Sequence, residues 1–295
     1  MTLADTPTRM TDSRQRTAVV ERAARAGGAV ARDAFRGPLT VETKANKNDL
    51  VTDADRETQR QIVHTIAGAF PDEPFVCEEE IDMQAATGED SDGLTGPAGQ
   101  QTGPMVESVS DTGPCWVVDP IDGTANFARG NVLWASSVAS VVDGEAVAAA
   151  TYLPAVQDIY TAGPESATRN GQRLAVSDRT DPETFAVGLV AAWPSERSGR
   201  LGALVQAVNE RFGDSRRYGT LQATLGFVAS GELEAAVTTE PTTPWDTIAG
   251  VELVRSAGGT VTDRHGERWT HNSDGLVASN GNAHDEIVAA IEEAN

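Results

Sequence analysis

The sequence predicts an α/β (α+β) fold with two sub-domains, and three observations support this prediction. The first half of the chain has two stretches with apolar residues at helical spacing, followed by a series of strand-like apolar runs. After Asn170-Gly171, helical and strand patterns alternate. The length of 295 residues is sufficient to bury a core in each part. We expect the two parts to join near residues 153–165.

The N-terminal region contains two predicted helices. Residues 1–15 are rich in Thr, Asp and Ser, and we expect them to form a flexible N-terminal tail in front of a domain that spans residues 16–291. Apolar residues recur at helical spacing from Ser13 to Phe35 and again from Asp53 to Ala69. A Gly-Pro pair follows the first stretch and a proline follows the second, so both helices have a predicted end.

A short strand and an insertion follow the second helix. Residues 74–80 are typical of a buried strand that runs into three glutamates. In residues 82–114, Gly, Ser, Thr, Asp, Glu and Gln dominate without any periodicity. We expect this segment to be an acidic surface insertion that is partly disordered.

The remaining elements follow from apolar runs and turn residues. Strands are predicted at residues 115–119, 135–142, 146–152 and 159–162, with Asp143-Gly144 as a hairpin turn. Helices at 199–212, 220–230, 247–257 and 283–293 then alternate with strands at 185–191, 233–238, 259–262 and 275–279. The two sub-domains would therefore occupy about residues 16–155 and 156–291.

The chain is strongly acidic, with 44 Asp and Glu residues against 23 Lys and Arg residues and a net charge of -21. Such a surface repels nucleic acid and anionic membranes, so we expect neither as a partner. No apolar run approaches the roughly 20 residues that span a bilayer. Few lysines and 5% aromatic residues indicate a halophilic, cytoplasmic protein. Its two cysteines, Cys77 and Cys115, are predicted to be free thiols.

The pattern Asp119-Pro-Ile-Asp122-Gly-Thr124 carries the strongest chemical signal. A buried strand delivers Asp119 at its carboxyl end, and Gly123-Thr124 opens a helix, so two carboxylates and the carbonyl of Ile121 meet near a helix N-terminus. Hard oxygen ligands suit Mg²⁺, and a helix N-terminus suits a phosphate group. The alternative is that Asp122 is an N-cap and Asp119 a turn residue.

Further acidic residues lie at strand ends and helix starts. Glu78 and Glu79 end a predicted strand, while Asp55 and Asp246 each begin a helix. Carboxylates so placed would repel one another unless cations lie between them, which favours a site for several metal ions. The alternatives are a capping box of Thr52 with Asp55, an N-cap at Asp246 and a solvated turn at the glutamates.

Four motifs resemble the inositol monophosphatase family, and the resemblance runs from about residue 16 to about residue 291. The motifs are Phe75-Val-Cys-Glu78-Glu79, Asp119-Pro-Ile-Asp122-Gly-Thr124-Ala-Asn-Phe, Asn170-Gly171-Gln-Arg-Leu-Ala-Val-Ser177 and Trp245-Asp246-Thr-Ile-Ala-Gly250. The resemblance implies a layered αβαβα sugar-phosphatase fold. The members of this family are Mg²⁺-dependent, lithium-sensitive phosphatases of small phosphorylated metabolites, so the resemblance implies a Mg²⁺-dependent phosphatase with two or three Mg²⁺ ions per site. Because the family is often dimeric, we expect a homodimer.

The resemblance also assigns roles to individual residues. The implied metal ligands are Glu78, Asp119, the Ile121 carbonyl, Asp122 and Asp246. Thr124 with Asp55 would orient or activate the attacking water, assisted by Glu78. The expected substrate-binding residues are Asp122, Gly123, Thr124, Gly219, Thr220, Arg217 and Glu240. Lys44 matches a lysine of a mobile loop that helps to hold the last metal, whereas Lys47 has no clear counterpart and both lysines have a solvated surface role as their alternative.

The sequence departs from the family in the expected substrate pocket. Where the family commonly has Gly-Ser/Thr-Ala-Ala, this chain has Gly219-Thr220-Leu221-Gln222. The family glutamate that often contacts an inositol hydroxyl falls on Thr239, and Glu240 is one position later. Arg216 and Arg217 are candidates to meet a second phosphate, with a surface role as the alternative.

These observations lead to one functional hypothesis and two alternatives. We expect hydrolysis of inositol monophosphate, fructose 1,6-bisphosphate or both by a metal-activated water. A 3′-phosphoadenosine 5′-phosphate or NADP phosphatase is the alternative within the same class. A non-catalytic protein that binds cations or phosphorylated metabolites on the same fold is the alternative from another class.

Overall fold

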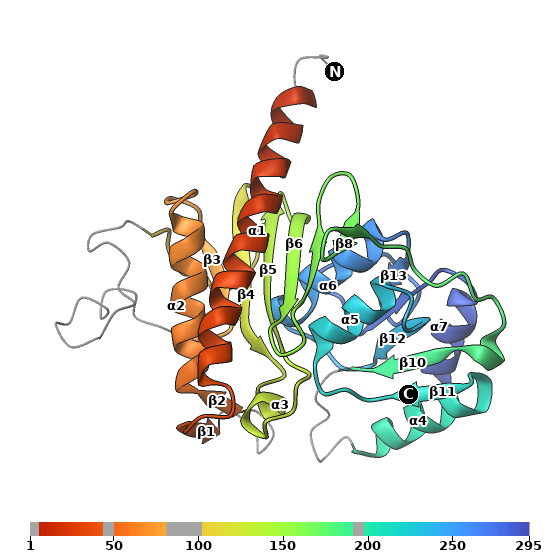
Figure 1. Ribbon diagram of the computed structural model, residues 1–295. Helices are drawn as coiled ribbons and strands as arrows, with labels where there is room; N and C mark the ends of the chain where they lie inside the picture. Colours follow the sequence, from red (N-terminus) through yellow and green to blue (C-terminus); the bar gives the residue numbers. More distant parts are fainter. Residues whose placement is uncertain (1–5, 44–49, 81–101, 191–197, 295) are drawn as a thin grey trace.

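The computed structural model describes residues 6–43, 50–80, 102–190 and 198–294, which form five layers (Figure 1). The layers are, in order, two helices, a first sheet, two central helices, a second sheet and two outer helices. This arrangement confirms the predicted αβαβα fold. None of the helices in these ranges is long and apolar enough to cross a membrane.

The first sheet has seven strands in the order β3-β4-β5-β6-β7-β8-β9. Its strands are β3 (Phe75–Cys77), β4 (Pro114–Asp122), β5 (Ala135–Val142), β6 (Glu145–Leu153), β7 (Asp158–Ala162), β8 (Ala167–Arg169) and β9 (Gln172–Arg173). β3 runs parallel to β4, and the other neighbours are antiparallel. Asp143 and Gly144 adopt positive φ angles of 53° and 79° between β5 and β6, which confirms the predicted hairpin turn.

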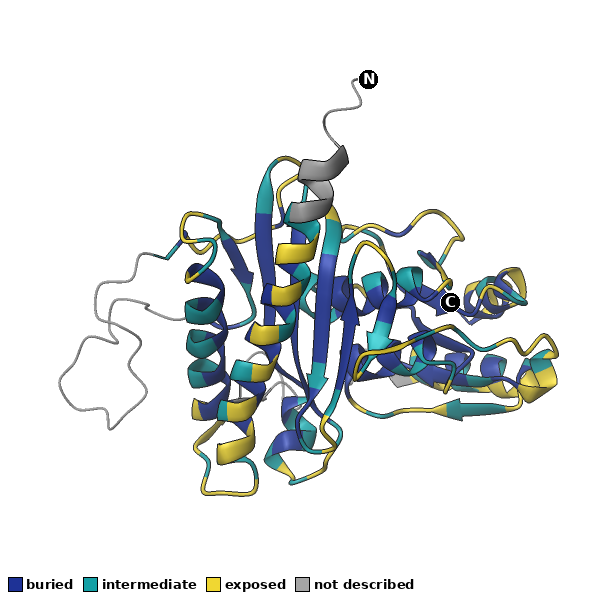
Figure 2. Ribbon diagram, turned by 45° about the horizontal axis from the view of Figure 1, so that its top comes forward, coloured by how far each residue is buried: buried dark blue, intermediate teal, exposed yellow. Residues whose placement is uncertain are grey.

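Helices α1 (Thr6–Ala34) and α2 (Asp53–Ala67) pack on one face of the first sheet. The inner faces of these helices and of the strands are buried, and the outer face of α1 is exposed (Figure 2). A small hairpin of β1 (Val41–Thr43) and β2 (Leu50–Thr52) leads into α2, and the short helix α3 (Thr124–Ala128) follows β4.

The second sheet has five strands in the order β11-β10-β12-β14-β13. They are β10 (Ala186–Leu189), β11 (Asp214–Arg216), β12 (Ala235–Thr238), β13 (Thr260–Thr262) and β14 (Leu276–Ser279), with the single turn η2 (Pro182–Thr184) before β10. Helices α4 (Ser198–Arg211) and α7 (His284–Glu293) pack against its outer face. Helices α5 (Leu221–Ala229) and α6 (Pro244–Ser256) lie between the two sheets, in one core with residues of both.

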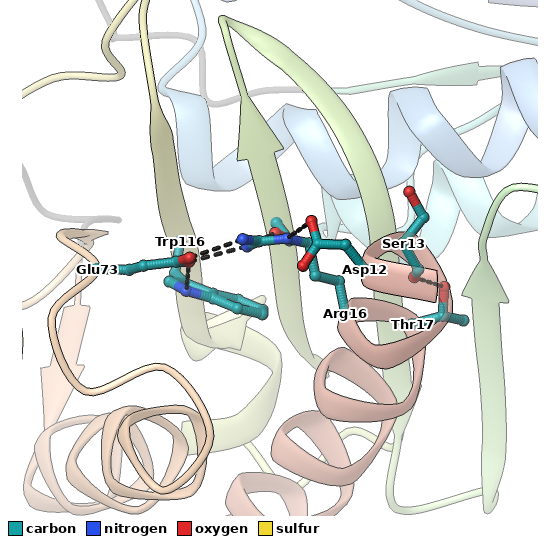
Figure 3. A network of polar contacts seen from close by, with 7 residues as sticks. Asp12, Ser13, Arg16, Thr17, Glu73 and Trp116 are labelled. Atoms are coloured by element: carbon teal, nitrogen blue, oxygen red, sulfur yellow. Dashed lines mark hydrogen bonds and ion pairs between the residues drawn. The ribbon is translucent and has the colours of Figure 1, made fainter. Parts of the chain in front are cut away.

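The N-terminal helix begins at Thr6, earlier than predicted, and Arg16 of this helix forms a buried ion pair (Figure 3). Arg16 is 5% exposed and its guanidinium donates to both carboxylate oxygens of Glu73, over 2.6 and 2.8 Å, and to Asp12 over 2.9 Å. Trp116 Nε1 donates to the same Glu73 carboxylate over 2.7 Å. Residues 6–15 of the expected N-terminal tail are therefore part of α1, although their polar composition favours disorder.

The predicted boundary between the sub-domains also needs correction. β7, β8 and β9 continue the first sheet as far as Arg173, so the chain changes sheets after that residue and not near residues 153–165. These short strands carry several polar residues, which weaken their sequence pattern. Helices α5 and α6 come later in the chain and still pack against the first sheet, so the two parts share one core.

The described end of the predicted insertion is ordered. Residues 81–101 lie outside the described ranges. Phe75 N donates to Pro104 O over 2.9 Å, and Val106 N donates to Phe75 O over 2.8 Å, so this segment pairs with the edge of β3. A Cβ atom on Gly103 would lie 1.9 Å from the carbonyl oxygen of Glu73, so this close approach requires glycine. Both cysteines are free thiols, as predicted.

Candidate active site

A bulge in β4 places Asp119 and Asp122 on the same face of the first sheet. Asp119 is paired with Ser137 and Asp122 with Ala135, so three steps along β4 match two steps along β5. In a regular strand, side chains three positions apart point to opposite faces. The extra residue restores a common side, and both carboxylates face the central helices.

Asp122 lies at the N-terminus of α5. Its carboxylate accepts hydrogen bonds from the Thr220 hydroxyl, from Leu221 N over 3.0 Å and from Gln222 N over 2.9 Å. These are the backbone donors that the first turn of a helix leaves unpaired. The alternative that Asp122 caps the following helix is wrong, because the N-cap of α3 is Gly123.

Asp246 reaches the same place from the first turn of α6. It accepts a hydrogen bond from the hydroxyl of Thr243, the N-cap residue, over 2.7 Å. Asp119, Asp122 and Asp246 each offer a carboxylate oxygen, and these three oxygens lie within 4.8 Å of one another. The structure therefore brings together three of the predicted metal ligands, at the starts of two helices.

Burial and the charges of neighbouring carboxylates raise the pKa values of Asp119 and Asp122. Burial is the largest cause for Asp119, whose pKa lies well above its ordinary value, and the charges of Glu78, Asp122 and Asp246 raise it further. Burial likewise raises the pKa of Asp122 to about 7, although the hydrogen bonds from Thr220 and the start of α5 lower it. A cation would remove the repulsion and hold both groups ionised at neutral pH.

Glu78 stands beside Asp119 because β3 and β4 are parallel. Cys77 is paired with Val118, and Glu78 N donates to Val118 O over 3.2 Å, so the next residues on the two strands are neighbours. Gln59 of α2 fixes the segment after Glu78: its amide donates to Glu79 O over 2.7 Å and accepts from Glu79 N over 2.9 Å. The glutamate run is thus anchored to α2 and is not a solvated turn.

Asp55 and Thr124 form a buried polar pair beside the three aspartates. Thr124 Oγ1 lies 3.2 Å from Asp55 Oδ1 and 3.0 Å from the carbonyl oxygen of Ile121. The other oxygen of Asp55 accepts from Thr52 N over 2.8 Å and from the Thr52 hydroxyl over 2.5 Å. Asp55 therefore takes part in a capping box, as its alternative role predicts, and its second oxygen meets Thr124.

Two glycines allow the chain to turn closely around Asp122. Gly123 has a φ angle of 86°, and a Cβ atom there would lie 3.1 Å from the carbonyl oxygen of Gly219. Gly219 has a φ angle of 76°, which favours glycine. Asn126 binds the two loops together by donating to Leu133 O over 2.7 Å and to Tyr218 O over 2.8 Å.

The remaining predicted substrate residues lie at the margin of this cluster. Glu240 is buried at the end of β12, and Arg200 Nη1 lies 3.8 Å from its Oε1 atom. Arg217 is exposed just before Gly219, and Arg216 forms an ion pair with Asp214. Lys44 and Lys47 lie outside the described residues, so the prediction for the mobile loop stays a prediction.

The donor set fits a divalent metal such as Mg²⁺. Asp119 Oδ1 is buried and has no hydrogen-bond partner among the described residues, which is costly unless a ligand meets it. The three clustered side chains offer hard, anionic oxygen atoms, and no described lysine or arginine forms an ion pair with Asp119 or Asp122. Magnesium and calcium sites are built from such oxygens.

Sequence reasoning missed the amide side chains that support the site. The Gln59 side chain forms hydrogen bonds with the backbone of Glu79. Gln222 joins α5 to α6, because its amide donates to Trp245 O over 2.5 Å and accepts from Gly250 N over 2.7 Å. A glutamine within a helical pattern gives no sign of such a contact. The position of Gln222 two residues after Thr220, where the family motif differs, was the one available signal.

Comparisons with known proteins agree with this geometry. Residues 12–295 match the model of the inositol monophosphatase family. A fructose-1,6-bisphosphatase/inositol-1-monophosphatase of Thermotoga maritima is 32% identical over 254 residues, which is 86% of each chain. The Nus factor SuhB of Escherichia coli is 28% identical over 287 residues, covering 93% of this chain and 97% of that protein. A solved inositol monophosphatase (IMPase) structure from Thermotoga maritima superposes with a TM-score of 0.78 at 28% identity, covering 92% of this chain and 95% of that one.

The family match spans nearly the whole chain, and the fold and the carboxylate cluster are those that the four sequence motifs predict. The chain therefore belongs to the inositol monophosphatase family and is a metal-dependent phosphatase, a phosphoric monoester hydrolase.

Proposed function

We propose that the protein uses Mg²⁺ to hydrolyse the phosphate monoester of a small metabolite, either inositol monophosphate or fructose 1,6-bisphosphate or both. The observation that carries this proposal is the convergence of Asp119, Asp122 and Asp246 at the N-termini of α5 and α6. Cations held by these carboxylates, next to two helix N-termini, make a local environment that attracts a phosphate group. The Thermotoga maritima relative carries both activities in its name.

The chain would hold two or three Mg²⁺ ions through oxygen atoms alone. We assign the side chains of Glu78, Asp119, Asp122 and Asp246 and the carbonyl of Ile121 as ligands. When bound, Mg²⁺ lowers the pKa of the water that it coordinates and neutralises the charge that develops on the phosphoryl oxygens. The burial of Asp119 and the helix donors around Asp122 would hold these side chains in place as the substrate binds.

Asp55 and Thr124 would prepare the attacking water. The Thr124 hydroxyl has a single proton, and its two close neighbours, Asp55 Oδ1 and Ile121 O, are both acceptors. When Thr124 donates to either one, its oxygen lone pairs are available to accept a hydrogen bond from the water. Asp55, assisted by Glu78, would then take up the proton through Thr124.

The reaction requires no covalent intermediate on the protein. Water attacks phosphorus in line with the leaving oxygen, the P–O bond to the metabolite breaks, and the leaving oxygen takes up a proton from solvent. The backbone of Gly123 and Gly219 would line the space where the phosphate sits, with Thr220 and Arg217 at its margin. We propose that the working enzyme is a cytoplasmic homodimer, adapted to high salt.

A phosphate-release panel with purified protein tests this function. The substrates are inositol 1-phosphate, fructose 1,6-bisphosphate, 3′-phosphoadenosine 5′-phosphate and NADP. Each is measured in high KCl, once with Mg²⁺ and once with EDTA in its place. We expect Mg²⁺-dependent release from one or both of the first two. Dominant release from either nucleotide would move the proposal to the alternative substrate class, and binding without turnover of any substrate would favour the non-catalytic alternative.

Two variants test the site. Asp122→Asn removes a proposed ligand but keeps the side-chain shape, and we expect phosphate release to fall by at least about a hundredfold while the folded structure persists. Asp111→Asn, at an exposed position before β4, is the matched control and should retain full activity. Activity of Asp122→Asn close to that of the unchanged protein would refute the assignment.

A further inference from the structure

The carboxyl edge of the second sheet carries arginine residues close to the candidate active site. β11, β10 and β12 are parallel neighbours, so their carboxyl ends lie at the same edge (Figure 1). β11 ends at Arg216, and β12 ends two residues before Glu240. β10 leads by way of residues 191–197 to α4, whose first turn contains Arg200. In open α/β sheets, ligands bind outside the carboxyl ends of parallel strands.

This edge is continuous with the proposed metal ligands. The chain that leaves β11 reaches Thr220 within four residues, and Thr220 donates to Asp122. The chain that leaves β12 passes through Glu240 to Asp246, six residues later. Arg200 contacts this second connection, since its Nη1 atom lies 3.8 Å from Glu240 Oε1. Arg200 therefore lies next to the connection that leads from β12 to Asp246.

The ion pair with Glu240 leaves much of the Arg200 side chain exposed. The Glu240 side chain is 4% exposed, and Arg200 supplies a positive charge 3.8 Å from its carboxylate. The Arg200 side chain is 52% exposed, and a guanidinium has five N–H donors in a planar fork. Because the Glu240 carboxylate lies beside only one edge of the guanidinium, other N–H donors of Arg200 face solvent. Glu240 thus keeps the guanidinium near the connection to Asp246.

The neighbouring arginines differ from Arg200 in this respect. Arg216 is exposed and forms an ion pair with Asp214 of its own strand, which directs it toward β11. Arg217 is exposed next to Gly219 and remains a candidate for the reacting phosphate. Arg200 instead pairs with a buried acid on the connection to Asp246.

We infer that Arg200 is a specificity residue that binds the second, non-reacting phosphate group of a bisphosphorylated small metabolite. This inference rests on the proposed phosphatase activity and names the substrate class that the site favours. Arginine and phosphate form paired, charge-assisted hydrogen bonds, and their geometry is more selective than that of a lysine contact. Because this phosphate does not react, the contact affects substrate affinity more than the rate of the chemical step.

The test compares substrates with one and with two phosphate groups. We measure kcat and KM of the full chain with Mg²⁺ for fructose 1,6-bisphosphate, 3′-phosphoadenosine 5′-phosphate and inositol 1-phosphate. In Arg200→Gln, the ratio of kcat/KM for a bisphosphate to that for the monophosphate should fall by about ten- to a hundredfold, through KM, which corresponds to one lost charged hydrogen bond. Arg200→Lys retains the charge without the fork and should give an intermediate ratio.

Arg211→Gln serves as the matched control, because Arg211 lies in the last turn of the same helix and pairs with Glu293. It should leave the ratio unchanged. The inference would be overturned if Arg200→Gln left the ratio of kcat/KM values unchanged, or if it lowered kcat by the same factor for all substrates. The proposed phosphatase activity would stand in either case. Absence of Mg²⁺-dependent turnover in the unchanged protein would instead overturn the proposed function. The bisphosphate with the larger loss identifies whether a sugar or a nucleotide fits between the two phosphate sites.

Discussion

The hydroxyl of Thr220 donates a hydrogen bond to Asp122, and Thr220 is also the residue that caps α5. One side chain thus connects the stability of a central helix to the position of a proposed metal ligand. Asp122 comes from the first sheet and Thr220 follows a strand of the second. Their contact therefore joins the two sheets at the site where catalysis is proposed.

Replacing Thr220 tests this connection. Thr220→Val keeps the shape but removes the hydroxyl, so we expect α5 to lose its N-cap at a cost of about 1 kcal/mol in the free energy of unfolding. Asp122 loses a donor in the same step, so half-maximal activity should require more Mg²⁺. Thr220→Ser restores the hydroxyl and should behave like the unchanged protein in thermal unfolding and in Mg²⁺ titration. Equal Mg²⁺ requirements for the valine and serine variants would argue against the connection.

Gln59 offers a test of the Glu78 position. Gln59→Ala would leave the buried N–H and carbonyl of Glu79 without their partners, which should cost about 1 to 3 kcal/mol of stability. Because Glu79 follows Glu78 directly, we also expect a lower rate of phosphate release in the protein that remains folded. Gln61→Ala is the control, since Gln61 bonds within its own helix. The idea fails if the two variants retain the same activity.

The acidic cluster should make the metal-free protein less stable as the pH rises. Burial raises the pKa of Asp119 well above its ordinary value and that of Asp122 to about 7, so both groups bind protons more tightly in the folded state. The stabilisation is complete below the ordinary pKa of an aspartic acid, near 3.8, and is lost as the pH rises toward 7 and above. Each unit by which a pKa is raised corresponds to about 1.4 kcal/mol.

Unfolding by urea measures this dependence. In EDTA, the free energy of unfolding should fall between about pH 5 and about pH 8, and Asp122→Asn should flatten the curve. High KCl in every sample screens the repulsion among exposed acids. Mg²⁺ should stabilise the protein most at the higher pH, where the ligands would otherwise repel one another. A metal-free stability that rises over this interval, or the same slope in Asp122→Asn, would contradict the prediction.

Gly250 tests the packing of the two central helices. A Cβ atom at this position would lie 2.5 Å from Leu225 Cδ1 and 2.6 Å from Leu225 Cβ, so Gly250→Ala should force α5 and α6 apart. We expect a loss of about 1 to 3 kcal/mol and weaker Mg²⁺ binding, because both helices begin at the site. Gly202→Ala is the control: this helical glycine has open space around its Cβ position and the change should stabilise α4 by about 0.4 to 1 kcal/mol. Circular dichroism melting curves distinguish the two outcomes.

The sequence was most informative where local patterns determine the structure. Asp119 lies in a buried strand, although that strand continues to Asp122, and Asp55 and Asp246 lie in the first turns of helices, so each position follows from neighbouring residues. The convergence of Asp119, Asp122 and Asp246 could be expected from the family motifs, and the structure places them together. Their roles as metal ligands remain proposals that the variants above address.

Features that depend on distant contacts could not be predicted. Gln59 and Gln222 lie within ordinary helical patterns, and their amides matter because of backbone groups 20 and 23 residues away. The buried ion pair of Arg16 with Glu73 joins residues 57 positions apart, so no local pattern predicts it. The Arg200–Glu240 pair joins two segments 40 residues apart, and no periodicity connects them.

The bulge in β4 has a consequence for how metal-binding motifs are compared between proteins. On a regular strand, two ligands share a face when one residue separates them, so the separation is an even number of steps. Here Asp119 and Asp122 are an odd number of steps apart and still share a face. If one residue between Asp119 and Asp122 were deleted and the bulge disappeared with it, both carboxylates would still share a face, but the Asp-x-x-Asp spacing would be gone. Loss of the bulge alone would preserve the motif and turn one carboxylate to the opposite side of the sheet. Parity and register, more than the letters of the motif, determine whether such a strand can bind its metal.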